Sequence, residues 1–131
     1  MTRFYDYGAV ATSAPKATEV GVKVFADRGN AFDAAVAVGL ALAVVHPAAG
    51  NIGGGGFAVI RDGRSGGVRT LDFRETAPAA ATTAMFLNDT GAVIDSASTF
   101  GARAAGVPGN VAGLHALWKE YGFQPWPELV E

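Results

Sequence analysis

The chain has 131 residues, enough for one domain of ordinary size, and half of them are hydrophobic while 17% are charged. So apolar a composition in so small a chain predicts that it packs against something else or forms part of a larger molecule. The net charge of −2 and the scattered basic residues argue against a nucleic-acid partner, and the absence of cysteine excludes disulfides, thiolate catalysis and cysteine-ligated metals.

No targeting or membrane segment is expected. Residues 1–7 lack a charged region followed by an apolar run, which is what a signal peptide requires. The longest apolar stretch, Ala34 to Val45, is shorter than the roughly 20 residues that span a bilayer. By these criteria alone the sequence predicts a soluble protein that is cytoplasmic, but it leaves the compartment open, since the absence of cysteine does not fix it.

The N-terminal part is predicted to form a strand and a helix. Ala9–Ser13 favours a short strand, which Pro15 ends, and Lys16–Ala26 places apolar residues at helical spacing. A turn is expected at Asp27–Gly29, where Gly29 would stop the helix.

The helix predicted most clearly begins after Asn30. Asn is a strong N-cap, and Asp33 at the third helical position completes a capping-box-like pair. Ala31–Val45 follows almost without polar residues, so we expect a helix buried on all sides that ends before His46-Pro47. His46 is interpreted as a residue of the helix C-terminus rather than as a catalytic base.

Four consecutive glycines, Gly53–Gly56, follow this helix. Without Cβ atoms they permit positive φ and the close approach of another backbone. Two interpretations remain open from the run alone. One is a tight crossing in a crowded core, and the other is a backbone cradle beside an active site.

A β-hairpin is predicted next, with strands at Phe57–Arg61 and Val68–Phe73. At its end lie Asp72, Arg74 and Glu75. Arginine grips carboxylates well because its planar fork offers two parallel hydrogen bonds, and Asp72 or Glu75 could orient it. A structural salt bridge explains this run of charge equally well.

The last third alternates loops and helices in the prediction. Ala79–Leu87 is expected to be a helix or an ordered loop, Asn110–Tyr121 an amphipathic helix, and Pro127–Glu131 the first turn of another helix. His115 is interpreted as a residue at the edge of the core rather than as a ligand.

Five motifs occur in an order and spacing that resemble the γ-glutamyltranspeptidases, also called glutathione hydrolases. They are Gly29–Ala37, His46-Pro47, Gly50–Phe57, Asp72–Pro78 and Gly106–Gly113. The resemblance covers nearly the whole chain, from about Gly8 to the end. Related acylases and enzymes that process poly-γ-glutamate share this lineage, so the resemblance indicates the family more firmly than the substrate.

The resemblance implies a fold and a reaction. The family fold is the αββα sandwich of N-terminal-nucleophile hydrolases, a mixed α/β (α+β) class, and residues 1–131 resemble one partial domain from the start of the large subunit. The implied reaction transfers a γ-glutamyl group from an amide such as glutathione to water or an amino acid, through an acyl-threonine and without a metal or organic cofactor.

Residue by residue, the resemblance assigns Arg74 to the α-carboxylate of the γ-glutamyl group, with Asp72 and Glu75 as supports. No catalytic residue is expected in this chain, because Thr76 and Thr82 do not match the nucleophile motif. The implied partners are the rest of the large subunit and the small subunit. The alternative is a degenerate, non-enzymatic fragment.

Overall fold

The computed structural model describes residues 2–5 and 8–131. Residues 1, 6 and 7 lie outside the described residues, and they belong to the segment in which no signal peptide is expected. Helices and strands are mixed along the chain, which confirms the predicted α/β class. Their order is β1 (Thr2–Tyr5), β2 (Gly8–Ala11), α1 (Pro15–Ala26), α2 (Ala31–Val45), β3 (Phe57–Arg61), β4 (Val68–Asp72), the 3-10 turn η1 (Ala102–Ala104), α3 (Asn110–Tyr121) and α4 (Trp126–Val130).

The strands form two antiparallel pairs within the described residues. β1 pairs with β2 from Thr2↔Ala11 to Tyr5↔Gly8. β3 pairs with β4 from Phe57↔Asp72 to Arg61↔Val68, which confirms the predicted hairpin. Within the described residues these two separate pairs and the four α-helices do not make a complete αββα sandwich, which agrees with the expectation that the fold is incomplete in this chain.

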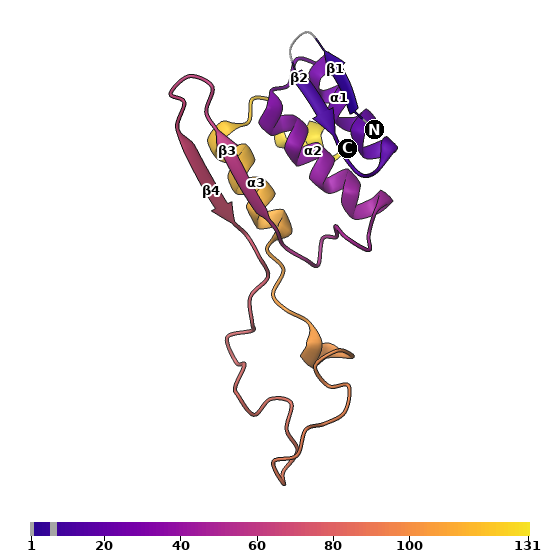
Figure 1. Ribbon diagram of the computed structural model, residues 1–131, viewed down its shortest axis with the longest axis vertical. Coiled ribbons are helices and arrows are strands. Elements are labelled where there is room, and N and C mark those ends of the chain that lie inside the picture. The colour runs from indigo at the N-terminus through magenta and orange to yellow at the C-terminus, as the bar shows by residue number, and fades with distance from the viewer. Residues whose placement is uncertain (1, 6–7) are drawn as a thin grey trace.

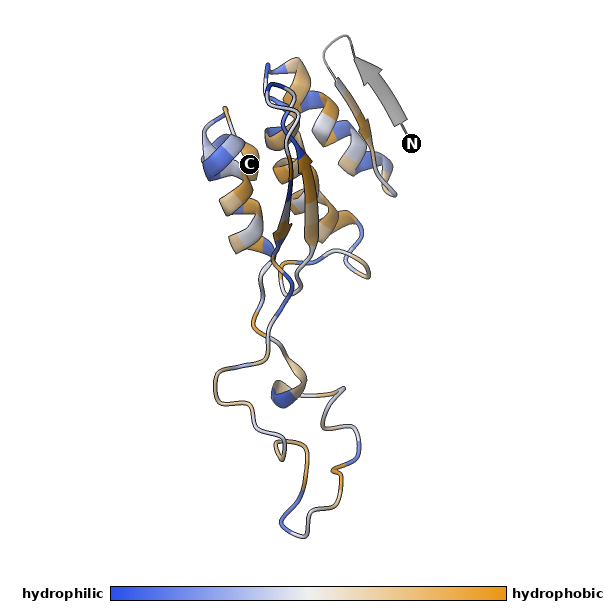
Figure 2. Cartoon of the chain, turned by 60° about the vertical axis from the view of Figure 1, so that its left-hand side comes forward, coloured by the Kyte–Doolittle hydropathy of each residue, from blue (hydrophilic) through white to orange (hydrophobic). Residues whose placement is uncertain are grey.

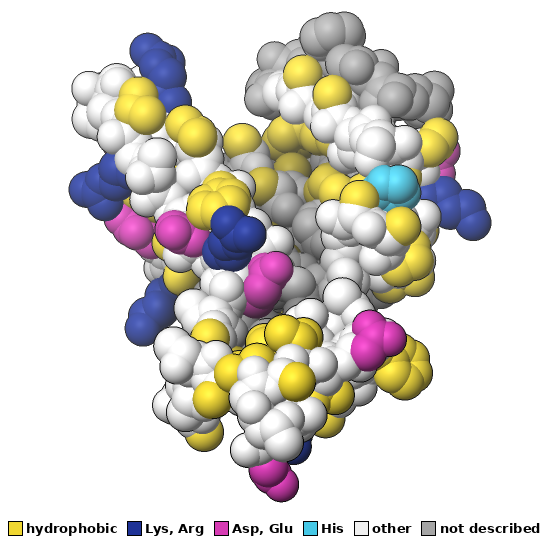
Figure 3. Space-filling model, turned by 60° about the horizontal axis from the view of Figure 1, so that its bottom comes forward, with side chains coloured by type: hydrophobic (Ala, Val, Ile, Leu, Met, Phe, Trp, Pro, Cys, Tyr) yellow, Lys and Arg dark blue, Asp and Glu magenta, His cyan; other side chains and the backbone are white. Residues whose placement is uncertain are grey.

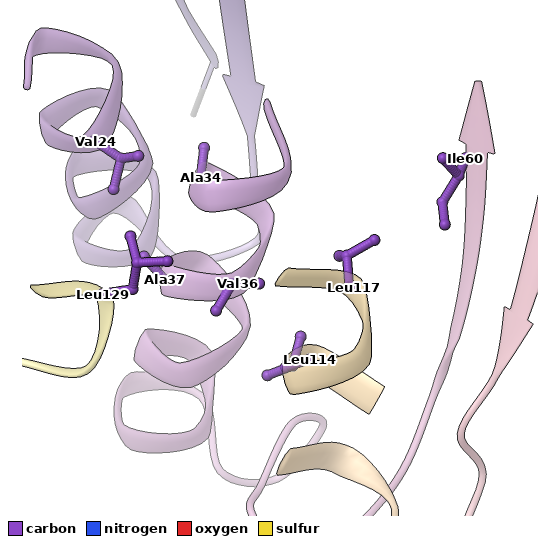
Figure 4. Packing of buried hydrophobic residues seen from close by; sticks show 8 residues of the cluster. All are labelled: Val24, Ala34, Val36, Ala37, Ile60, Leu114, Leu117 and Leu129. Atoms are coloured by element: carbon purple, nitrogen blue, oxygen red, sulfur yellow. The ribbon is translucent and has the colours of Figure 1, made fainter. Parts of the chain in front are cut away.

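Helix α2 lies at the centre of the body, with α1 along one side and α3 along the other (Figure 1). The core forms where these helices meet β3 and α4 (Figure 4). Its buried side chains come from five elements: Val24, Ala34, Val36, Ala37, Ile60, Leu114, Leu117 and Leu129.

The start of α2 is fixed by the predicted capping box, which is confirmed. The Asn30 side chain accepts hydrogen bonds from the backbone N–H groups of Phe32 and Asp33, at 2.8 and 3.0 Å. The Asp33 carboxylate in turn accepts from the backbone N–H of Asn30 at 2.8 Å. Three backbone N–H groups at this helix end, those of Asn30, Phe32 and Asp33, are therefore satisfied by side chains.

The prediction that α2 is buried on all sides is wrong for this chain. Its C-terminal half is only partly covered, and Val44 is 76% exposed. An open apolar groove of about 350 Å³ runs between β2, α1 and α2. The physical reason is that the chain supplies helices for only some sides of α2, although almost all residues of α2 are hydrophobic. The colouring of the chain by hydropathy (Figure 2) shows the apolar helices behind the β3–β4 hairpin.

The turn after α1 also differs in detail from the prediction. The left-handed residue is Arg28, with φ of 66°, and not Gly29. Gly29 is needed for space, because a Cβ there would lie 2.5 Å from a methyl of Val24. Arg28 and Gly29 donate their N–H groups to the last turn of α1, so the pair together ends the helix.

Residues 74–109 leave the body as one long excursion made of turns (Figure 1). Its neck is closed by the bridge between Thr76 and Val107. Ala79–Leu87 is an ordered loop here rather than a helix. Viewed from this end of the molecule (Figure 3), hydrophobic side chains lie open on the surface, and Phe100 is 84% exposed.

The remaining predictions for the last third hold. α3 forms over the predicted residues, and α4 begins at Trp126. His115 is exposed at the edge of the core, where its ring packs against Trp118 and Trp126. Among the helices of the described ranges, none is both long and apolar enough to cross a membrane.

Candidate carboxylate-binding site

Arg74 lies two residues after the end of β4, where the hairpin ends and the excursion of residues 74–109 begins. Asp72, the last residue of β4, accepts a hydrogen bond from the backbone N–H of Arg74 at 3.0 Å. The carboxylate of Asp72 thus holds the Arg74 backbone and not its guanidinium. The Arg74 side chain is exposed.

The glycine run passes directly beside this backbone. A Cβ on Gly55 would lie 2.5 Å from the carbonyl oxygen of Phe73 and 2.6 Å from the Cα of Arg74. Gly109, in the segment that returns to the body before α3, also packs against this backbone. A Cβ on Gly109 would lie 2.0 Å from the same Phe73 oxygen. Only residues without side chains fit at either position.

Hydrogen bonds lock the crossing together. The carbonyl oxygen of Gly54 accepts from the N–H groups of Gly109 and Asn110, both at 3.0 Å, and Phe73 N–H donates to the Gly56 oxygen at 3.0 Å. No glycine from 53 to 56 has positive φ. The glycine run therefore forms a tight crossing against the backbone of Arg74, as one interpretation expected. The crossing does not lie in a crowded core, because Gly53 and Gly55 are exposed.

The Arg74 side chain lines an open hollow of about 330 Å³ at the base of the excursion. Its wall also contains the side chains of Glu75 and Arg103, and an apolar part formed by Pro78, Met85 and Phe86. Sequence analysis did not single out Arg103. The only available signal was a lone cation in a run of small residues, and no spacing rule links it to Arg74.

Two charged groups of this hollow, those of Arg74 and Glu75, have no partner within residues 8–131, whose side chains the structure describes. The guanidinium of Arg74 makes no hydrogen bond or ion pair there, and the carboxylate of Glu75 makes none either. Neither of the predicted supports therefore contacts the Arg74 fork. A free guanidinium on a fixed backbone is a suitable receptor for a carboxylate.

Several charged groups elsewhere in the described chain have structural partners. Lys23 pairs with Asp27 one helical turn away. In the hairpin turn, hydrogen bonds from the backbone N–H of Arg64 and the hydroxyl of Ser65 hold the pKa of Asp62 below its usual value. These groups already have partners, unlike Arg74 and Glu75 of the hollow.

No group of three or more metal-ligating side chains occurs in the described part of the chain. His46 ends α2, and His115 lies in the aromatic cluster with Trp118 and Trp126. Neither histidine lines the hollow with Arg74. What this hollow offers to a ligand is therefore charge, hydrogen-bond donors and an apolar wall.

Comparisons with known proteins place this arrangement in context. A family model described as gamma-glutamyltranspeptidase matches residues 17–131. A glutathione hydrolase proenzyme of Pseudomonas sp. (strain A14) is 54% identical over 127 residues, which are 95% of this chain and 22% of that protein. The chain thus spans about a fifth of the length of this curated relative.

Solved structures give the same picture. The gamma-glutamyltranspeptidase of Helicobacter pylori superposes with a TM-score of 0.90 and 53% identity, over 98% of this chain and 36% of that one. The transpeptidase CapD of Bacillus anthracis superposes with a TM-score of 0.71 and 34% identity, over 97% of this chain and 36% of that one.

Proposed function

The chain belongs to the gamma-glutamyltranspeptidase family, and from this premise we propose that it forms the substrate-anchoring part of an enzyme that cleaves γ-glutamyl amides such as glutathione. The single observation that carries the proposal is the guanidinium of Arg74, which has no partner within residues 8–131 and lines an open hollow, on a backbone packed closely against Gly55 and Gly109. Its ligand in the proposal is the α-carboxylate of the γ-glutamyl group.

The proposed role of Arg74 is orientation. Two parallel hydrogen bonds from the guanidinium to the α-carboxylate fix both the position and the rotation of the glutamyl group. The γ-carbonyl, at the other end of that group, is then presented to the nucleophile. Positioning of this kind lowers the barrier by replacing a chance encounter with a fixed geometry.

The proposed nucleophile is a threonine contributed by a part of the protein outside these residues. Its hydroxyl attacks the γ-carbonyl, the amide C–N bond breaks, and the amine leaves with a proton. Water or an amino acid then takes the acyl group from the threonine and regenerates its hydroxyl. Splitting one difficult displacement into two easier steps is the advantage of covalent catalysis.

Glutathione-type substrates are favoured over those of a related acylase by the pattern of likeness. Identity is 54% to a protein named a glutathione hydrolase proenzyme and 26% to a cephalosporin acylase of Bacillus halodurans. Asp72 and Glu75 have supporting roles in the proposal, Asp72 through the Arg74 backbone and Glu75 through the charge balance of the hollow.

The test is an Arg74→Ala substitution in the full-length protein that carries this segment. Loss of one partner of a buried, hydrogen-bonded charge pair costs on the order of 2–5 kcal/mol. At this open hollow we expect the lower end, a loss of roughly 30-fold in kcat/KM for a γ-glutamyl anilide. Arg74→Lys should restore little, because an ammonium group cannot make the two-pronged contact. The matched control is Arg61→Ala, at the opposite end of the hairpin.

A second substrate separates binding from folding. An analogue whose α-carboxylate is amidated never makes the contact, so Arg74→Ala should change its turnover little. Equal losses for both substrates in a folded, self-cleaved variant would show that Arg74 is structural. Failure of every γ-glutamyl substrate with the parent protein would instead support a non-enzymatic fragment.

A further inference from the structure

We propose that Arg103 is a second carboxylate-binding residue of the same site, and that it selects γ-glutamyl peptides with a free C-terminal carboxylate. Arg103 lies on η1, 29 residues after Arg74, yet both side chains line one hollow of about 330 Å³. The inference rests on the proposed function, since it assigns Arg74 to the first carboxylate.

The guanidinium of Arg103 is held in place by a hydrogen bond, but no carboxylate of the described residues neutralises its charge. Its Nη1 donates to the backbone oxygen of Met85 at 3.4 Å, which ties the guanidinium to the facing side of the excursion. It forms no ion pair with any carboxylate of the described residues. A guanidinium has five N–H donors, so most of those on Arg103 remain available to a ligand.

The hollow carries an excess of positive charge. Arg74 and Arg103 bring two positive charges, and Glu75 is the one acidic side chain among the described lining residues. Two like charges on one hollow are unfavourable unless an anion offsets them. The complementary ligand carries two carboxylates and one ammonium group, and a γ-glutamyl peptide carries all three.

The rest of the wall of the hollow includes an apolar surface. Pro78, Met85 and Phe86 lie in the same hollow, and Met85 is the residue to which Arg103 is tied. An apolar surface between two cations suits a ligand whose charged ends are separated by uncharged atoms. A peptide bound by Arg74 at its glutamyl end would extend its C-terminal end along this wall toward Arg103.

The test compares glutathione with its glycine ethyl ester in the full-length, self-cleaved enzyme, by measuring released glutamate. The two substrates differ only in the C-terminal carboxylate. For Arg103→Gln we expect the ratio of kcat/KM for glutathione to kcat/KM for the ester to fall roughly tenfold. This is the lower end of the range for losing a hydrogen bond to a charged group, because the site is open to solvent. The loss should appear in KM, because this contact lies away from the reacting carbonyl.

Three further variants make the result decisive. Arg103→Lys keeps the charge and should recover part of the ratio, whereas Arg64→Gln, in the hairpin turn, should leave the ratio unchanged. Arg74→Gln should weaken both substrates equally, because both carry the α-carboxylate. If Arg103→Gln weakens both substrates equally, or neither, the inference is overturned while the proposed function stands. If Arg74→Gln weakens neither, the proposed function fails and the inference with it.

Discussion

The tight crossing beside Arg74 leads to a strong prediction for Gly55→Ala. A Cβ at this position would lie 2.5 Å from two backbone atoms, the Phe73 oxygen and the Glu75 nitrogen. Ordinary contacts begin near 3.4 Å, so the two backbone segments must separate by almost 1 Å. Neither atom belongs to a flexible side chain that could turn away, and overpacking of this kind costs about 1–3 kcal/mol.

The displaced segment is the one that carries the proposed substrate clamp. A misplacement of about 1 Å at a positioning residue can cost about 100-fold in rate. We therefore expect Gly55→Ala in the full-length enzyme to lower kcat/KM for a γ-glutamyl anilide by about that factor, and to lower the free energy of unfolding by about 2–3 kcal/mol. The matched control is Gly63→Ala, since a Cβ there meets nothing within 4 Å.

A double-mutant cycle distinguishes an effect through Arg74 from general damage. If Gly55→Ala acts by moving Arg74, it should add little to the loss already caused by Arg74→Ala. Fully additive losses would mean that the glycine acts elsewhere. Gly55→Ala with the stability and kinetics of the parent would refute the steric reasoning itself.

Three further predictions follow from the chain as described. The 131-residue chain alone should not transfer the γ-glutamyl group of a chromogenic anilide, and turnover that survives repurification would contradict this. The 131-residue chain alone should also bind a hydrophobic dye and melt without a sharp transition. The reason is that Val44 and the groove beside α2 are open, and exposed apolar surface costs about 25 cal/mol per Å². A cooperative transition in a monomer that binds no dye would show that the chain folds alone. Asn30→Ala should lower the free energy of unfolding of the full-length enzyme by about 1–2 kcal/mol, measured by denaturant titration, and Asn30→Asp, which can still cap the helix, should lower it less.

Sequence analysis predicted best where the chemistry is local. The capping box of Asn30 and Asp33 joins residues three positions apart, so its pattern is visible along the chain. The hairpin and the amphipathic helix α3 were also predicted with bounds within a residue of those observed. In each case the partners are near neighbours, or share one regular period.

What could not be predicted depends on distant parts of the chain. The glycine run has one partner at Phe73 and another at Gly109, and nothing in its own sequence names either. The hydrogen bond of Asp72 to the Arg74 backbone, in place of its fork, depends on the local path of the chain beyond β4. Arg103 reaches the hollow only because the excursion folds back on itself.

The burial of α2 was mispredicted for a different reason. Periodicity shows which faces of a helix are apolar, but it does not show whether the same chain supplies the covering elements. Val44 is 76% exposed although its surroundings in the sequence are apolar. An all-apolar helix in a short chain is thus better evidence of a missing neighbour than of a closed core.

The carboxylate of Asp33 has a consequence for the order of folding. One oxygen caps its own helix, and the other accepts from the N–H groups of Phe123 and Gln124, which lie 90 and 91 positions further along the chain. Asp33 is fully buried in the folded chain, and until those donors arrive water must solvate the second oxygen. The local capping box can therefore start α2 early, but we expect Asp33 to be buried only after residues 123 and 124 are available to pair with it.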